Sequence, residues 1–234
     1  MKKADPDGVI DTFQAATTAA LDDWRLIDDA LIPLGLHIRR RAASDAFLAL
    51  AVSWEFFIST WVVAAVNRDT SKAIARLEGQ MQDHALNELG LPASTLSSSL
   101  VTTSHLNLSA VRSVLDRRDW NIVIRYQKEL DTVAGKWLAG PYEARAKAIT
   151  AYQFAPALVV RVIRNALAHQ SLGAIKEANE VVRKNSTPPA LRYSGVRSLG
   201  VDGWGRYLLS SSVPTPRIAA LHDELIALSE RLRS

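Results

Sequence analysis

One stretch of the sequence, residues 161–169, brings together side chains that suit the chemistry of phosphate esters. It reads RVIRNALAH in one-letter code and ends an apolar run. On a helix of about 3.6 residues per turn, Arg161, Arg164, Asn165 and His169 project from one side, and the apolar residues between them project from the other. Arginine is a permanent cation whose planar fork fits phosphate, and histidine takes up and releases protons near neutral pH. The stretch therefore predicts phosphate binding and proton transfer, and it holds no carboxylate or thiol that would indicate a metal site.

The spacing of five residues between arginine and histidine is a weak signal by itself. It occurs a second time, at Arg217 and His222, and a chain rich in arginine contains such pairs by chance. The two pairs differ in context. A polar residue follows the arginine of the first pair, whose helix is predicted to end near Gly173, whereas an isoleucine follows Arg217 inside a helix that continues. The first pair is therefore the candidate site.

Basic side chains are concentrated around this candidate site. The formal net charge is only +4, but residues 161–217 hold nine basic and three acidic side chains, and residues 1–35 hold three basic and seven acidic ones. Clustered cations on one surface attract a polyanion such as a nucleic acid at long range. A solvated charged surface explains the same composition, so charge alone leaves both interpretations open.

The composition excludes several classes of site. There are no cysteines, so the chain has no disulfide, no thiol nucleophile and no sulfur-ligated metal. The other histidines lack partners at metal-ligand spacing, and the sequence contains no glycine-rich phosphate loop, nucleophile elbow or HExxH motif. We therefore expect neither a metal nor a cofactor. No apolar segment follows the basic first residues, which argues against a secretory signal and favours a cytoplasmic protein.

Apolar residues at helical spacing predict helices along most of the chain. The predicted ranges are about 9–31, 36–66, 71–89, 127–139, 141–151, 154–170, 172–184 and 216–232, with a short helix around Val111 and a Ser/Thr-rich loop over 94–107. Because the sequence shows no internal repeat and no sharp shift in composition, residues 1–234 are predicted to form one all-α domain. We expect a helical bundle with its core at about 36–185.

Residues 46–66 form an apolar run with one charge, Glu55. The run is long enough to cross a bilayer, and the arginines at 39–41 would suit the cytoplasmic flank of such a span. A carboxylate near the midpoint is costly in a membrane, however, and no second span is available to pair with it. A central bundle helix covered on all sides gives the same pattern. We therefore expect a core helix and no membrane, with a buried partner for Glu55 such as Arg164.

A Pro/Gly-rich region, 188–216, precedes the closing helix at 216–232. The dipeptide Asp202-Gly203 within it is typical of a tight hairpin turn, so we expect a small hairpin insertion near the C-terminus. Basic and aromatic side chains around that turn would hold phosphates and stack on bases. The residues expected to contact RNA there are Arg197, Trp204 and Arg206. The alternative is a hairpin that only covers the bundle.

The sequence around the candidate stretch resembles the HEPN domains, all-α bundles found in toxins, abortive-infection proteins and other ribonucleases of prokaryotic defence. The string VIRNALAH is similar to the Arg-polar-x3-His motif of that family, and Trp54-Glu55 resembles a pattern on an earlier helix of its larger members. The resemblance covers about residues 40–185. The catalytic residues that it implies are Arg164, Asn165 and His169.

The resemblance also implies a partner and a reaction. Two copies of the motif would meet across the two-fold axis of a homodimer, with RNA as the substrate and Arg161 helping to bind it. His169 would take the proton from a ribose 2′-hydroxyl, Arg164 would hold the charge on the phosphate, and the second copy of His169 would protonate the departing 5′-oxygen. An antitoxin or a defence protein would be the further partner.

Some members of the family keep the bundle without the activity, so fold carries over more safely than function. The alternative is a non-catalytic helical module that binds a partner protein or a nucleic acid. In that case Arg164 pairs with Glu55 for structural reasons only, and His169 caps its helix.

Overall fold

The computed structural model describes residues 3–88, 105–115, 122–210 and 215–234, and within these ranges it is all-helical, without a strand. The helices are α1 (Pro6–Ala30), α2 (Leu36–Arg68), α3 (Ser71–Asn87), α5 (Leu108–Leu115), α6 (Gln127–Trp137), α7 (Gly140–Ala148), α8 (Ala151–His169), α9 (Leu172–Arg183), α10 (Gly203–Leu209) and α11 (Arg217–Glu230). The all-α prediction is confirmed, and the predicted helices begin and end within one turn of the observed ones. The loop predicted over 94–107 lies mostly outside the described residues.

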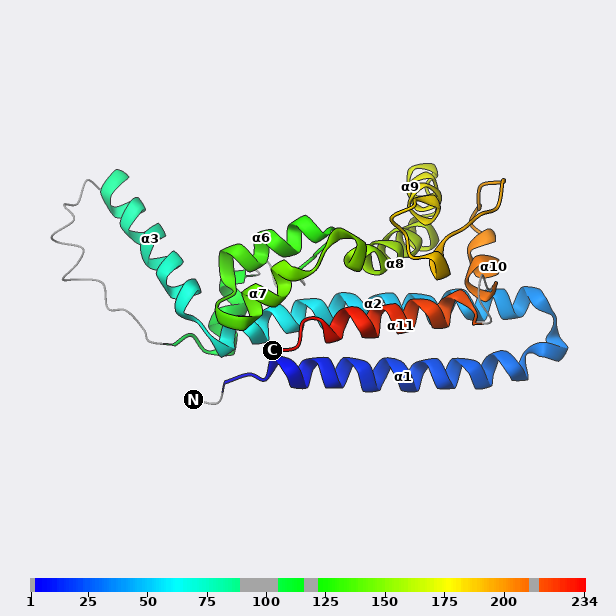
Figure 1. Cartoon of the computed structure of the whole chain (residues 1–234), viewed down its shortest axis with the longest axis horizontal. Helices are drawn as coiled ribbons and strands as arrows, with labels where there is room; N and C mark the ends of the chain where they lie inside the picture. The colour runs from blue at the N-terminus through cyan, green and yellow to red at the C-terminus, as the bar shows by residue number, and fades with distance from the viewer. Residues whose placement is uncertain (1–2, 89–104, 116–121, 211–214) are drawn as a thin grey trace.

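α1 and α2 form a long hairpin with α11 beside it (Figure 1). Apolar residues at helical spacing pack the two helices together, and Phe13 of α1 stacks on Phe57 of α2 with ring centroids 4.4 Å apart. Trp54 of α2 lies against both rings, at 5.8 and 5.3 Å. The turn between the helices needs Gly35, whose φ of 94° lies in the left-handed region that side chains disfavour. The aromatic cluster fixes Trp54, which also lines the pocket described below.

α2 is the central helix and packs against α1, α5, α8, α10 and α11. Phe47 and Trp61 on it are completely buried. The prediction that α2 is covered on all sides is wrong, however, because Val52 and Phe56 are 57% and 60% exposed. No described helix covers that side. The Glu55 side chain, next to Phe56, keeps 43% of its surface exposed, so its charge costs less than a buried one would.

α2 is long and apolar enough to cross a membrane, as its sequence indicates. Half of the residues in its most apolar 18-residue window are buried inside the protein. α7 and α8 meet the same criterion only when taken together, and they are bent by 81° where they join. A long, partly buried apolar helix is also what the core of a helical bundle contains. The absence of a membrane therefore stays a prediction.

α8 carries the candidate stretch, and the local sequence fixes both of its ends. At its start, the hydroxyl of Thr150 accepts a hydrogen bond from the backbone of Gln153 (3.3 Å), and the side chain of Gln153 accepts one from the backbone of Thr150 (2.9 Å). At its end, Gln170 adopts a left-handed conformation with a φ of 51°, and Ser171 then caps α9. His169 is consequently the last residue of α8.

The Pro/Gly-rich region does not form the predicted hairpin. Residues 203–209 form α10 instead, which packs against α2 (Figure 1). Trp204 and Tyr207 are both buried, and their spacing of three residues suits one face of a helix and not one face of a strand. Gly205 permits the close approach, because a Cβ at that position would collide with the backbone carbonyl of Arg40.

The second arginine–histidine pair of the sequence is structural. Arg217 is 5% exposed and His222 is 6% exposed. The Arg217 guanidinium donates to the backbone carbonyls of Ser210 (3.1 Å) and Arg192 (3.0 Å), and it lies over the ring of Tyr207 at 4.8 Å. These contacts tie the segment around α10 to α11, so the guanidinium of Arg217 is used within the fold.

Candidate functional site

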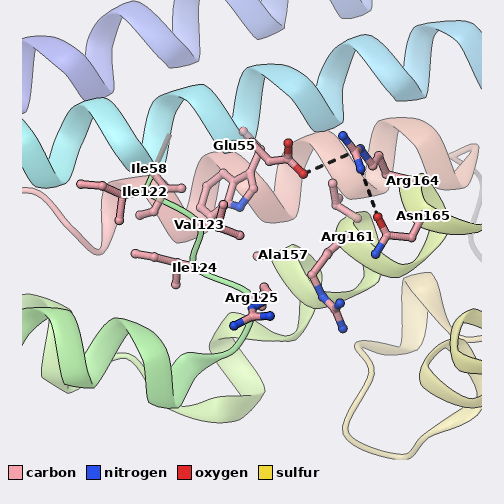
Figure 2. Close-up of a pocket in the computed structure, with 12 residues that line it drawn as sticks. Glu55, Ile58, Ile122, Val123, Ile124, Arg125, Ala157, Arg161, Arg164 and Asn165 are labelled. Carbon is pink, nitrogen blue, oxygen red and sulfur yellow. Dashed lines mark hydrogen bonds and ion pairs between the residues drawn. The ribbon is translucent and has the colours of Figure 1, made fainter. Parts of the chain in front are cut away.

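A pocket of about 270 Å³ lies between α2, the segment 122–125 and α8 (Figure 2). Its walls are mostly apolar and are formed by Trp54, Ile58, Ile122, Val123, Ile124, Ala157 and Val160. Its polar lining residues are Glu55, Arg125, Arg161, Arg164 and Asn165. The fold thus gathers four of the predicted site residues, three from α8 and one from α2, around a single cavity.

Two of the three arginines at the pocket are held tightly by carboxylates. Arg161 Nη2 lies 2.6 Å from Oε1 of Glu177 on α9, and its guanidinium stacks over the ring of Tyr126 at 4.8 Å. Arg125 Nη2 lies 2.9 Å from Oε1 of Glu129, one turn along the chain. Because both guanidinium groups already have a carboxylate at hydrogen-bonding distance, they are less available to a phosphate.

Arg164 is held more loosely. Its Nε lies 3.9 Å from Oε1 of Glu55, which is beyond hydrogen-bonding distance, and its Nη1 donates to Oδ1 of Asn165 at 3.2 Å. The predicted pairing with Glu55 is therefore present, but both partners are partly exposed, at 33% and 43% of their side-chain surface. Pairs of this kind contribute about 0–1 kcal/mol. Among the three arginines of the pocket, Arg164 is thus the one from which a phosphate would most easily displace the carboxylate.

His169 does not line the pocket. It is exposed at the end of α8, and its imidazole makes no hydrogen bond or ion pair with any other described residue. Four positions separate it from Asn165, so the two side chains lie on nearly the same face, about one turn apart. The side chain of His169 does not cap the helix. Gln170 is the C-cap residue, and its backbone N–H donates to the carbonyl of Ala166. His169 is therefore free to meet a ligand or a second protein chain at this end of α8.

The three other residues predicted to bind RNA do not line this pocket. Arg197 and Arg206 are exposed elsewhere, in the segment before α10 and on α10 itself. The prediction for Trp204 is wrong. Its indole is completely buried and meets the ring of Tyr207 edge-on at 5.8 Å, because the region folds into a helix with this face toward the core. It cannot stack on a base.

One part of the pocket has no counterpart in the sequence prediction. The segment 122–125 forms the wall opposite α8, and the backbone N–H of Ile122 donates to the hydroxyl of Ser59 on α2 at 3.0 Å. The only signal in the sequence is a run of three β-branched apolar residues followed by Arg125. Such a run indicates burial, but it does not tell which helix the run will face.

Within the described ranges, no group of three or more histidine, aspartate or glutamate side chains could hold a metal ion. The chain matches no family model, no curated protein and no solved structure in comparisons with known proteins. The function therefore has to be argued from the site.

Proposed function

We propose that this protein is a metal-independent endoribonuclease of the HEPN type that acts as a homodimer. The observation that carries the proposal is the state of three side chains on α8: Arg164, Asn165 and His169 lie along one side of the helix, and none of them is hydrogen-bonded to a carboxylate. A guanidinium and an imidazole in this condition are what cleavage of a phosphodiester without a metal requires.

The reaction follows from the chemistry of these groups. Neutral His169 accepts the proton of a ribose 2′-hydroxyl, whose oxygen attacks the adjacent phosphorus. Arg164 stabilises the extra negative charge on the phosphate oxygens, which contributes about 3–4 kcal/mol where water is excluded. The bond to the 5′-oxygen breaks and that oxygen takes up a proton, leaving a 2′,3′-cyclic phosphate and a 5′-hydroxyl.

A dimer supplies the second proton carrier. One protomer offers a single free imidazole at this end of α8, while in-line displacement uses a base on one side of the phosphorus and an acid on the other. The exposed residues that follow the motif, from Gln170 to Gly173, leave this end of α8 open to a partner. A two-fold axis beside His169 would place both imidazoles in one cleft. The setting that we infer is prokaryotic defence or a toxin–antitoxin pair in the cytoplasm.

The test is cleavage of single-stranded RNA by the purified protein in EDTA, with the product ends identified by mass spectrometry. We expect cyclic-phosphate ends, a loss of at least about 100-fold in rate for Arg164→Ala, and a loss of about 10²–10⁴-fold for His169→Ala. Arg145→Ala and His37→Ala are matched controls, because both residues are exposed and lie outside the site. Activity that survives in both motif variants would belong to a contaminant and would end the proposal.

A second function is favoured by one observation, the apolar surface at the turn between α1 and α2. Large apolar side chains there are half or more exposed: Leu26, Ile27, Ile32, Leu34 and Leu36. Exposed apolar surface of this kind is typical of a protein contact. A non-catalytic module would bind its partner through this turn. It would show no RNA cleavage, and the two motif variants would bind the partner as the unmodified protein does.

A further inference from the structure

The pocket beside Arg164 has the size and lining of a site for one small planar group. Its volume of about 270 Å³ is just below the roughly 300–1,000 Å³ of sites that take larger ligands. Its apolar lining comes from Ile58 of α2, from Ala157 and Val160 of α8, and from the segment 122–124. Figure 2 shows Ile58 beside Ile122, and Ala157 on α8. Walls of this kind bury the faces of an aromatic ring.

The arginines that line the pocket are paired with carboxylates. Arg125, Arg161 and Arg164 each have a carboxylate within ion-pair distance, supplied by Glu129, Glu177 and Glu55 respectively. Only Glu55 of these carboxylates lines the pocket, but a phosphate inside would find the guanidinium groups of Arg125 and Arg161 already paired, and it would lose its hydration among apolar walls. A neutral ring with polar atoms on its edge suits this lining better, with any phosphate left at the mouth beside Arg164.

Asn165 supplies a group that reads the edge of such a ring. Its Oδ1 accepts from Arg164 Nη1, which fixes the orientation of the amide and turns both hydrogens of Nδ2 away from that contact. No other described residue accepts from Nδ2. Two donors without a partner at a pocket wall match the acceptor atoms on the edge of a nucleobase.

We propose that this pocket binds a single unstacked nucleobase of RNA, with the phosphate of the same nucleotide at Arg164. Unstacked bases of single-stranded RNA are bound in this way, by apolar contact with their faces and hydrogen bonds to their edges. The pocket would thus select the base next to the cleaved phosphate. This consequence for cleavage rests on the proposed function, whereas base binding stands by itself.

Base binding is measured by titrating the His169→Ala protein with AMP, GMP, CMP and UMP and with ribose 5-phosphate, using NMR or calorimetry. We expect at least one nucleotide to bind at least about tenfold more tightly than ribose 5-phosphate, because stacking contributes about 1–3 kcal/mol per base. Equal affinity for ribose 5-phosphate would show a phosphate site and would overturn the proposal.

Two variants of the same protein locate the binding. Ala157→Leu fills the pocket from α8 and is expected to weaken nucleotide binding by about tenfold or more; Ala151→Leu, at an exposed position on the same helix, is the matched control. Asn165→Ala adds no volume and is expected to weaken nucleotide binding by about fivefold, because it removes the two donors to the edge of the base. This variant locates the binding site if Ala157→Leu fails to fold. Unchanged affinity in a folded Ala157→Leu protein, or in Asn165→Ala, contradicts the assignment.

The two proposals fail in different ways. If nucleotides bind as expected and RNA is not cleaved, the base pocket stands and the nuclease does not. If RNA is cleaved but no nucleotide binds, and the KM for RNA is the same with Ala157→Leu as without it, the nuclease stands and the base pocket is wrong.

Discussion

The carboxylate of Glu55 lies 3.9 Å from the guanidinium of Arg164, which makes this the loosest of the three ion pairs around the pocket. Glu55 and a phosphate would compete for the same cation. Neutralising the carboxylate in Glu55→Gln is therefore expected to lower the KM for RNA by up to about fivefold, which corresponds to the 0.2–1 kcal/mol of an exposed pair. The rate constant kcat should hardly change, since Arg164 remains.

The control for Glu55→Gln is Glu180→Gln. Glu180 is an exposed acid on α9 that contacts Lys176 at 4.0 Å and does not line the pocket, so it reports the general effect of removing one negative charge. A KM that falls equally in both variants would show a nonspecific effect. A collapse of kcat in Glu55→Gln would show instead that the carboxylate positions the guanidinium.

A second prediction concerns the crossing of α10 over α2. Gly205→Ala is expected to destabilise the protein by about 2–3 kcal/mol, because the new Cβ would collide with the Arg40 carbonyl and the helices have to separate. For a chain of this size that lowers the Tm by roughly 5–10 °C. Gly79→Ala is the matched control, since nothing lies within 4 Å of a Cβ there and alanine favours the helix. Equal Tm values for the two variants would refute the close crossing.

The sequence predicted the helices well because their signals are local. The glycine at position 35, for example, separates two predicted helices without help from the rest of the chain. The capping box at Thr150 is a local signal too, but the prediction did not use it and began the helix at 154 instead of 151. The face of α8 that carries Arg164 and His169 follows from helical periodicity, which is also local. The all-α fold class and the shared face of the candidate residues on α8 were accessible for this reason.

The sequence predictions were wrong or incomplete where two local signals disagreed, or where packing between distant segments determines the structure. Asp202-Gly203 reads as a hairpin turn, but the spacing of Trp204 and Tyr207 is helical, and burial of both rings decides the outcome. The pocket could not be predicted, since the segment 122–125 comes to α8 only through tertiary packing. Periodicity likewise did not reveal that the side of α2 next to Glu55 stays uncovered.

A third prediction concerns pH. Hydrogen bonds from Lys147 and Lys72 lower the pKa of the Glu143 carboxyl below its usual value of 4.5, and the contact with Lys72 links α7 to α3 at 2.7 Å. A carboxyl whose pKa is lower in the folded state stabilises the protein above the unfolded-state pKa, and this contribution disappears as the pH falls through the folded-state pKa. Glu143→Gln is therefore expected to lower the free energy of unfolding by about 1 kcal/mol at pH 7, and the difference should shrink below pH 4.5.

Urea unfolding at a series of pH values measures that difference. Glu180→Gln serves again as the control, because its pair with Lys176 is exposed on both sides and joins no two helices. If Glu143→Gln and the unmodified protein differ by the same amount at every pH, the ion pairs of Glu143 do not contribute to stability.

The last prediction tests whether two protomers share one site. Arg164→Ala and His169→Ala proteins are each expected to be inactive, since each dimer lacks both copies of one group. A dimer formed from one protomer of each kind keeps one guanidinium and one imidazole in the shared cleft, so the charge on the phosphate is stabilised again and one of the two proton transfers is catalysed, with water in place of the second imidazole. Unfolding and refolding the two proteins together should therefore restore cleavage to roughly tenfold or more above either variant alone. The matched control is the double variant refolded with the unmodified protein. If the mixture of single variants stays inactive while the control mixture cleaves RNA, each protomer carries a complete site of its own and the shared cleft is wrong.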